Sequence, residues 1–320
     1  MGFSEPFCAG VVILQESIKL LSKNGKLIVL TILPTLLLTS ISFVIFNLSY
    51  ESLLRDMLIR ECIIPLTSAS SAEFSNKLAG LRENFGLMLV VHITFILSYT
   101  IISLFSITAT VLIFSVSYTE RTLSHRGFAL LVLKSLKRPL ITGFYTTMLD
   151  IGYIYFVLDL AGPLTFSGKT MGEQLGVLFL VAAGGYMWYL YFSMVWILGI
   201  VISVIEENCN GIEALGKAGK LIKGKRIQGY IMNIILVMIS VLVVLLIQGF
   251  GGIRGHKWPV NDTIFGMFLV NLSCLLRLFH FVAHTVLYFQ CKKNHGEEIE
   301  FLGEVEYTKT STIPIVYDIP

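Results

Sequence analysis

The stretch GIEALGKAGKLIKGKRIQGYIMNIILVMISVLVVLLIQGF, residues 211–250, joins a short basic segment directly to a long apolar one. As a helix, the apolar part (229–250) is long enough to cross the roughly 30 Å hydrocarbon core of a bilayer. The basic part separates into an apolar face of Ile212, Leu215, Ala218 and Ile222 and a polar face of Glu213, Lys217, Lys220 and Lys223. We therefore predict an amphipathic helix in the membrane interface that leads into a membrane span.

The glycine spacing of the same segment also resembles a nucleotide-binding loop. Gly211, Gly216 and Lys217 match most of that spacing, but Ala218 stands where a Ser or Thr would bind magnesium. The preceding residues, MVWILGIVISVI (194–205), are typical of the end of a membrane helix and not of a buried strand. Ala218 and the preceding membrane helix therefore favour an interfacial helix over a nucleotide-binding loop.

Composition extends the prediction to the whole chain. Apolar residues make up 55% of the 320 residues, charged residues 14%, and the mean hydropathy is +0.77. Such values are typical of integral membrane proteins. Six apolar runs have spanning length, at 27–48, 86–117, 140–161, 175–205, 229–250 and 263–289. We predict an all-α, polytopic integral membrane protein with six transmembrane helices and three basic amphipathic interfacial helices.

The basic motif recurs along the chain as KLLSKNGKLI from Lys19, KSLKRPLI from Lys134 and KLIKGKRI from Lys220. Each copy precedes two spans, which predicts three units starting near residues 8, 120 and 208 within a membrane domain of residues 1–290. In the first copy, Val11, Leu14, Ile18 and Leu21 form the apolar face. Cytoplasmic loops also become basic through the orientation rule alone, so this alternative to true repetition stays open.

Lysines of these segments are the expected contacts for anionic lipid headgroups. They are Lys19, Lys23, Lys134, Lys137, Lys217, Lys220, Lys223 and Lys225.

Sixteen of the 24 Lys and Arg residues lie in the amino-terminal arm, in 118–139, in 206–228 and in the tail, and seven lie in the alternate connecting segments. This distribution predicts that both termini are cytosolic, in an endomembrane or the plasma membrane. Residues 291–320 are expected to form a flexible cytosolic tail that a protein partner could bind.

Three segments together resemble a plant family of uncharacterised multi-pass transmembrane proteins. They are ESIKLLSKNGKLIVLTILP (16–34), GIEALGKAGKLIKGKR (211–226) and TIPIVYDIP (312–320). More distantly, a basic helix before a span is similar to the membrane domain associated with some bacterial glycerophosphoryl diester phosphodiesterases. The resemblance implies an integral membrane protein and brings no catalytic residues with it.

A charge inside the predicted spans costs about 3 kcal/mol or more without a partner, and four of the ionisable residues found there form a candidate polar cluster. They are Asp150 in the third span and Arg277, His280 and His284 in the sixth. Asp150 and Arg277 could form an ion bridge that fixes helix packing, or the four could line a substrate or proton path. Small residues at 182–185 favour close packing of a neighbouring helix or, alternatively, a cavity wall.

These observations favour a non-enzymatic membrane organiser or lipid-associating scaffold whose partners are anionic lipids. The alternative function is a transporter or channel-like conduit that uses the Asp/Arg/His cluster. The sequence implies no catalytic site, cofactor, metal or nucleic-acid partner, because it places no nucleophile with a base and no set of metal ligands at a suitable spacing.

Overall fold

The computed structural model describes residues 4–23, 25–63, 72–118, 125–166, 170–253 and 259–297. Every regular element in these ranges is an α-helix, which confirms the predicted all-α class. The helices are α1 (Ser4–Lys23), α2 (Gly25–Ile63), α3 (Ala72–Tyr118), α4 (His125–Ser135), α5 (Lys137–Phe166), α6 (Met171–Ile205), α7 (Gly211–Leu221), α8 (Arg226–Ile253) and α9 (Pro259–His295).

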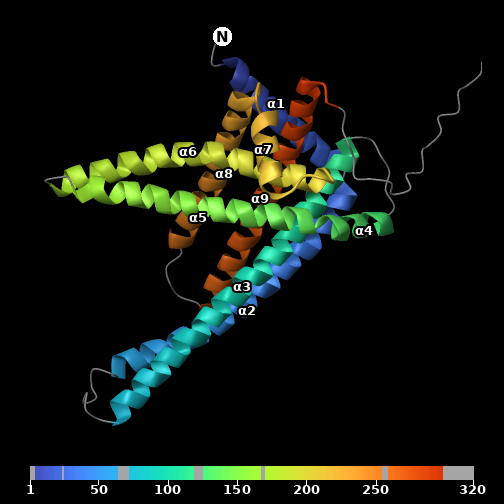
Figure 1. Ribbon diagram of the computed structural model, residues 1–320. Helices are drawn as coiled ribbons and strands as arrows, with labels where there is room; N and C mark the ends of the chain where they lie inside the picture. The colour runs from blue at the N-terminus through green and yellow to red at the C-terminus, as the bar shows by residue number, and fades with distance from the viewer. Residues whose placement is uncertain are drawn as a thin grey trace, which may run out of the picture.

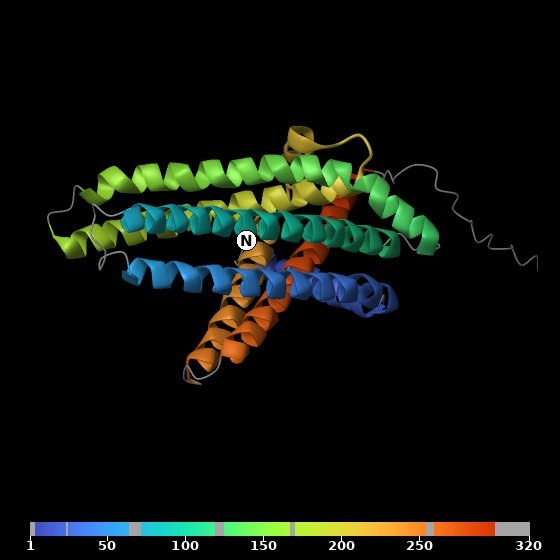
Figure 2. The same ribbon diagram turned by 90° about the horizontal axis from the view of Figure 1, so that it is seen from below.

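Along the described chain, one short helix and two longer ones follow each other three times. The longer helices pack in pairs as the hairpins α2–α3, α5–α6 and α8–α9. Figure 1 shows the three hairpins diverging from a common region that contains α1, α7 and the carboxyl-terminal ends of α6 and α9. Seen from below, α8–α9 crosses the direction of the other two hairpins (Figure 2). Whether the three units are true repeats stays a prediction.

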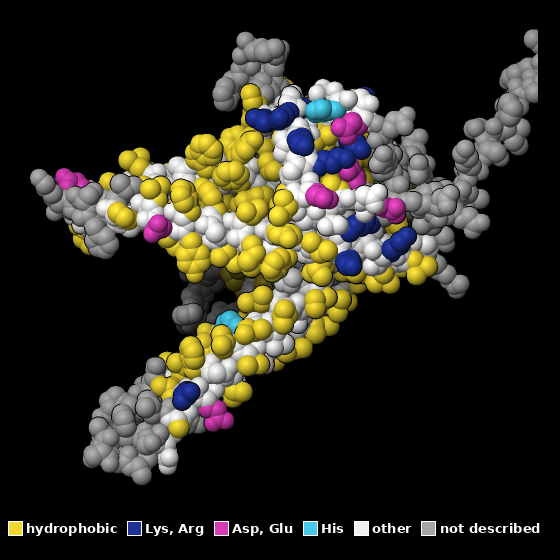
Figure 3. Space-filling model, viewed as in Figure 1, with side chains coloured by type: hydrophobic (Ala, Val, Ile, Leu, Met, Phe, Trp, Pro, Cys, Tyr) yellow, Lys and Arg dark blue, Asp and Glu magenta, His cyan; other side chains and the backbone are white. Residues whose placement is uncertain are grey.

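Six described segments are long and apolar enough to cross a membrane, which confirms the predicted number of spans. They are Thr31–Ile59, Ala79–Tyr118, Gly127–Pro163, Met171–Ile205, Arg226–Leu246 and Thr263–His295. Large apolar side chains remain exposed along the hairpins, for example Ile45, Leu97 and Phe179, and Figure 3 shows hydrophobic side chains along the hairpins on this face. Such surfaces are unfavourable in water and fit a surrounding of lipid.

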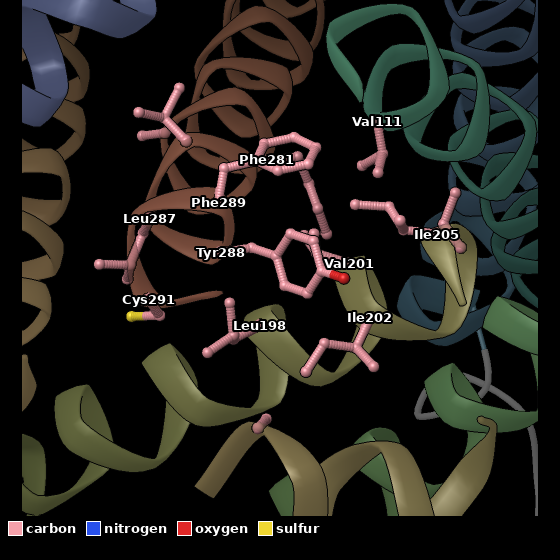
Figure 4. Packing of buried hydrophobic residues seen from close by; sticks show 14 of the residues in the cluster. Val111, Leu198, Val201, Ile202, Ile205, Phe281, Leu287, Tyr288, Phe289 and Cys291 are labelled. Carbon is pink, nitrogen blue, oxygen red and sulfur yellow. The ribbon is translucent and has the colours of Figure 1, made fainter. Parts of the chain in front are cut away.

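The buried core lies where the hairpins converge. We call this region, centred on the carboxyl-terminal halves of α6 and α9 and the short helices around them, the hub. From Leu190 onward α6 is largely buried, because α3, α5, α7, α8 and α9 all pack against it. Figure 4 shows Leu198 and Ile202 of α6 close to Tyr288 of α9, with Val111 of α3 nearby. A helix that is apolar on all sides is expected to be buried in this way.

The short helices α1, α4 and α7 contribute residues to this core. Their buried side chains include Ile13 and Leu14 of α1, Leu131 and Val132 of α4, and Ala214, Ala218 and Leu221 of α7. Two residues assigned to apolar faces from the sequence, Ile18 and Ile212, are instead exposed. The small residues of α7 face inward because α7 lies close to α6, where Gly199 approaches Leu215. A position of these helices in a membrane interface remains a proposal.

The last helix extends further than the sequence predicted. Residue 291 was expected to begin a flexible tail, but α9 continues through His295, and Cys291 and Lys292 are buried in the hub. This boundary is therefore corrected: the apolar and ionic contacts of the hub hold these residues in the helix. Residues 298–320, the rest of the expected tail, lie outside the described residues.

Candidate functional site

A cavity of about 750 Å³ lies between the hairpins and is lined by residues of α3, α5, α6, α8 and α9. Three of the four ionisable residues predicted to form an intramembrane cluster line it: Asp150 of α5 and Arg277 and His280 of α9. These residues are far apart in sequence and come together because α6 lies between α5 and α9 in the fold. The volume is within the range of small-molecule sites.

Asp150 and Arg277 share the cavity without forming an ion pair, judged over the described residues. The Tyr189 side chain of α6 lines the same cavity as Asp150. The Oδ1 atom of Asp150 is buried and has no hydrogen-bond partner among the described groups. Arg277 is exposed. The ion bridge considered as a packing device between these two helices is therefore not formed in this structure.

The two histidines occupy different surroundings. His280 lines the cavity, and its Nε2 atom lies 3.5 Å from the Ser240 hydroxyl of α8. His284 is fully buried, does not line the cavity, and its Nδ1 atom lies 2.8 Å from the His280 carbonyl oxygen. The imidazole rings stack with their centroids 6.4 Å apart. The structure thus brings together three members of the predicted cluster and leaves His284 in the hub.

A second polar group, which the sequence did not reveal, surrounds Glu206 at the end of α6. Glu206 is 6% exposed. Its carboxylate lies 2.6 Å from Lys217 Nζ of α7 and 3.4 Å from Lys292 Nζ of α9, and it accepts a 2.9 Å hydrogen bond from the Tyr288 hydroxyl. The Arg138 guanidinium of α5 donates to the Glu206 backbone carbonyl oxygen at 2.6 Å. We call these five residues the Glu206 network.

The charge of Glu206 changes the pKa values of Lys217 on α7 and of Cys209 between α6 and α7. Burial by itself lowers the pKa of Lys217, but the hydrogen bond and charge of Glu206 raise it, and the net pKa is raised. The pKa of Cys209 is raised by burial and then by Glu206. Lys217 is therefore paired with Glu206 in this structure, and its contact with a lipid headgroup stays a prediction. The only sequence signal for this network was an acidic residue directly after a span, in a basic segment.

The other lysines expected to meet lipid lie at the hub. Lys19, Lys134, Lys137, Lys220 and Lys223 are exposed. Lys225 is partly buried, with its Nζ atom 3.4 Å from the Gln290 side-chain oxygen, and the side chain of Lys23 lies outside the described part of the chain. Figure 3 shows Lys and Arg side chains gathered over the hub on this face, with few along the hairpins.

Comparison with known proteins shows the family. A family model described as "Domain of unknown function (DUF8558)" matches residues 7–304. The chain belongs to this family. The matched range contains the cavity and the Glu206 network, so both lie within the region that defines the family. No curated protein and no solved structure matches the chain.

Of the resemblance expected from the sequence, the comparison shows only that the chain belongs to a family of unknown function. The comparisons provide no link to plants or to the membrane domain of the phosphodiesterases. Within the described residues, no group of three His, Cys, Asp or Glu side chains is placed to hold a metal ion. Any function proposed for this DUF8558 chain therefore rests on the chemistry of the cavity, the hub and the exposed apolar surfaces.

Proposed function

We propose that this protein is a non-enzymatic membrane scaffold that associates with anionic lipids through the lysines of its hub. One observation carries the proposal: exposed lysines gather where the six apolar helices converge. With the apolar hairpins in a bilayer, these lysines lie near its surface. Each basic residue near an anionic surface contributes roughly 1 kcal/mol of attraction.

The orientation is part of the same proposal. α1 and the carboxyl-terminal end of α9 both lie at the hub, so the two ends of the described chain are on one side. The excess of Lys and Arg on this side favours the cytosol, at an endomembrane or the plasma membrane. A protein partner for the tail is a further part of the proposal that concerns residues outside the described range.

The proposal can be tested with the purified full-length chain in phosphatidylcholine vesicles that contain traces of dansyl-labelled phosphatidylserine or phosphatidylcholine. Energy transfer from tryptophan measures which labelled lipid gathers around the protein. We expect a salt-sensitive preference for phosphatidylserine that falls severalfold in the double variant Lys220→Gln and Lys223→Gln, because two exposed charges are lost.

The matched control is the double variant Arg55→Gln and Arg82→Gln. It removes the same number of positive charges at exposed positions of the α2–α3 hairpin. Both positions are many residues away from the ends of α2 and α3 that lie at the hub. This variant should keep the preference. An equal loss in both variants, or no preference in the wild-type protein, contradicts the scaffold proposal.

The cavity supports a second candidate function, a conduit. Asp150, Arg277 and His280 line one space within the spans, which is the arrangement expected of a polar path. The probe is proton uptake into proteoliposomes that contain a pH-sensitive dye. A conduit requires that Asp150→Asn abolishes uptake without lowering the amount of folded protein, while Asp159→Asn, at an exposed position of the same helix, does not. Absence of uptake by the wild-type chain rules out proton conduction.

A further inference from the structure

The cavity between the hairpins has a polar end and an apolar end. Its lining residues nearer the hub on α3, α5 and α6 are mainly apolar: Leu104, Ile107, Pro139, Leu140, Ile197 and Ile200. Those further from the hub on the same helices are mainly polar: Tyr99, Thr100, Ser103, Thr146, Thr147, Asp150, Tyr189 and Ser193. On α9 the order is mixed, because His280 lies next to Phe281 on the hub side of Arg277. On α8, Ser240 lies nearer the hub than Val244, so the gradient is confined to α3, α5 and α6. A ligand with one apolar and one polar end matches this gradient.

Six serine and threonine hydroxyl groups that line the cavity act as hydrogen-bond acceptors towards a ligand. Thr147 donates to the Gly143 carbonyl oxygen at 2.8 Å, and Thr100 donates to that of Ile96 at 2.7 Å. Thr146, Ser193, Ser240 and Ser273 likewise donate to carbonyl oxygens of their own helices. Because a hydroxyl has one proton, these groups offer only their oxygen lone pairs to the cavity.

Asp150 adds the strongest acceptor. Its buried Oδ1 atom has no hydrogen-bond partner among the described groups, and a carboxylate is acceptor-only when ionised. A buried acceptor without a partner is costly, so a donor from a ligand would be favourable here. A phosphate or carboxylate headgroup would meet these acceptors and the Asp150 charge unfavourably, although the exposed Arg277 lies at the same end.

We infer that the cavity binds one neutral lipid that carries a free hydroxyl group, of the diacylglycerol class. The hydroxyl donates to Asp150 at the polar end, and the hydrocarbon body lies against the apolar residues near the hub. This inference rests on the proposed lipid-associating function and names a ligand for it at a site separate from the lysines of the hub.

The inference is tested by photo-crosslinking of the purified full-length chain in phosphatidylcholine nanodiscs. The probe is a diacylglycerol with a diazirine and an alkyne in one acyl chain, and the comparison probe is the phosphatidic acid with the same chains. We expect diacylglycerol to label peptides of α5 and α6, to be competed by unlabelled diacylglycerol, and to label more strongly than phosphatidic acid. Asp150→Asn should lower the labelling by about tenfold, because a charge-assisted hydrogen bond is replaced by a neutral one, and Asp159→Asn should not.

A second pair of variants tests the position without removing an ionisable group. A Cβ atom added at Gly143, which lines the cavity, or at Gly152 would meet nothing within 4 Å. Nine residues are two and a half helical turns, so these positions lie on opposite faces of α5. Gly143→Phe should fill the cavity and abolish labelling, whereas the exposed Gly152→Phe should label like wild type.

Labelling of Gly143→Phe at the wild-type level overturns the site, and equal labelling by phosphatidic acid overturns the ligand class. The lysine variants used to test the scaffold proposal change no residue of the cavity. Diacylglycerol labelling that persists in those variants therefore supports the cavity site even where the preference for phosphatidylserine is absent.

Discussion

At the scale of single residues, Glu206 joins more elements than any other group in its network. Its side chain meets Lys217 of α7 and both Tyr288 and Lys292 of α9, and its backbone carbonyl accepts from Arg138 of α5. Lys292 also lies 3.7 Å from Glu297. Buried charges of this kind require a partner, so removing one member costs more than the pair itself contributes.

Replacing Glu206 with Gln keeps the size of the side chain and removes its charge. Lys292, whose side chain is 3% exposed, then loses the nearer of its two carboxylates and keeps the more distant Glu297, while the more exposed Lys217 can regain water. We expect the free energy of unfolding to fall by about 3 kcal/mol, measured as thermal unfolding in detergent. Glu207→Gln is the control, because Glu207 is the next residue and is exposed. Equal melting of the two variants would argue against the network.

The pKa of the Cys209 thiol also depends on the charge of Glu206. Burial and the negative charge of Glu206 raise the pKa of Cys209, so the thiol stays protonated to a higher pH in the folded protein than in the unfolded chain. A raised pKa of this kind stabilises the fold below the unfolded pKa, and this contribution is lost as the pH rises through the folded value. In a variant with Cys209 as its single cysteine, the pH profile of maleimide labelling should therefore lie at higher pH than in the protein unfolded by SDS. Coincident profiles would contradict the effect.

At the scale of elements, the position of α7 depends on a close approach to α6. A Cβ atom added at Gly199 would lie 2.7 Å from Leu215 Cδ2 and 3.4 Å from its Cα atom, so a branched side chain cannot fit without moving α7. We expect Gly199→Val to destabilise the protein by about 1–3 kcal/mol through overpacking. Thermal unfolding measures the loss. Gly184→Val serves as control, because a Cβ atom added at Gly184 would meet nothing within 4 Å; destabilisation by both variants would point to valine itself as the cause.

These glycines also show what could be predicted from sequence. The six spans were found because each depends on the composition of its own segment. The small residues at 182–185 favoured a close approach, and Gly185 does lie near Val157 of α5. Close approaches of α6 also occur at Gly199, which faces Leu215 of α7, and at Met194, which faces Gly229 of α8. The sequence did not predict the approaches at Gly199 and Met194 or the Glu206 network, because both depend on how separate helices pack. The members of the network belong to four elements, and only the packing of the hub decides which charges meet.

At the scale of the whole molecule, the hub and the hairpins contrast in composition and burial. The hub combines a buried core with most of the visible Lys and Arg side chains, whereas the hairpins expose apolar side chains over most of their length. Lipid can stabilise the hairpins without a core of their own, because their backbone hydrogen bonds are satisfied within each helix. The hub then acts as the common support from which the three hairpins extend (Figure 1).

This division predicts a simple topology. If each hairpin crosses the bilayer twice, the hub and the hairpin tips lie on opposite sides of the membrane. In a chain without its other cysteines, we expect Cys8 and, separately, Lys223→Cys at the hub to react with a membrane-impermeant maleimide only when the cytosolic face is accessible. Asn76→Cys and Thr170→Cys, exposed near the tips of α2–α3 and α5–α6, should react only from the other face. Reaction of tip and hub positions from the same face would show that the hairpins lie along the membrane. A hairpin that crosses the bilayer twice places its tip on the side opposite the hub.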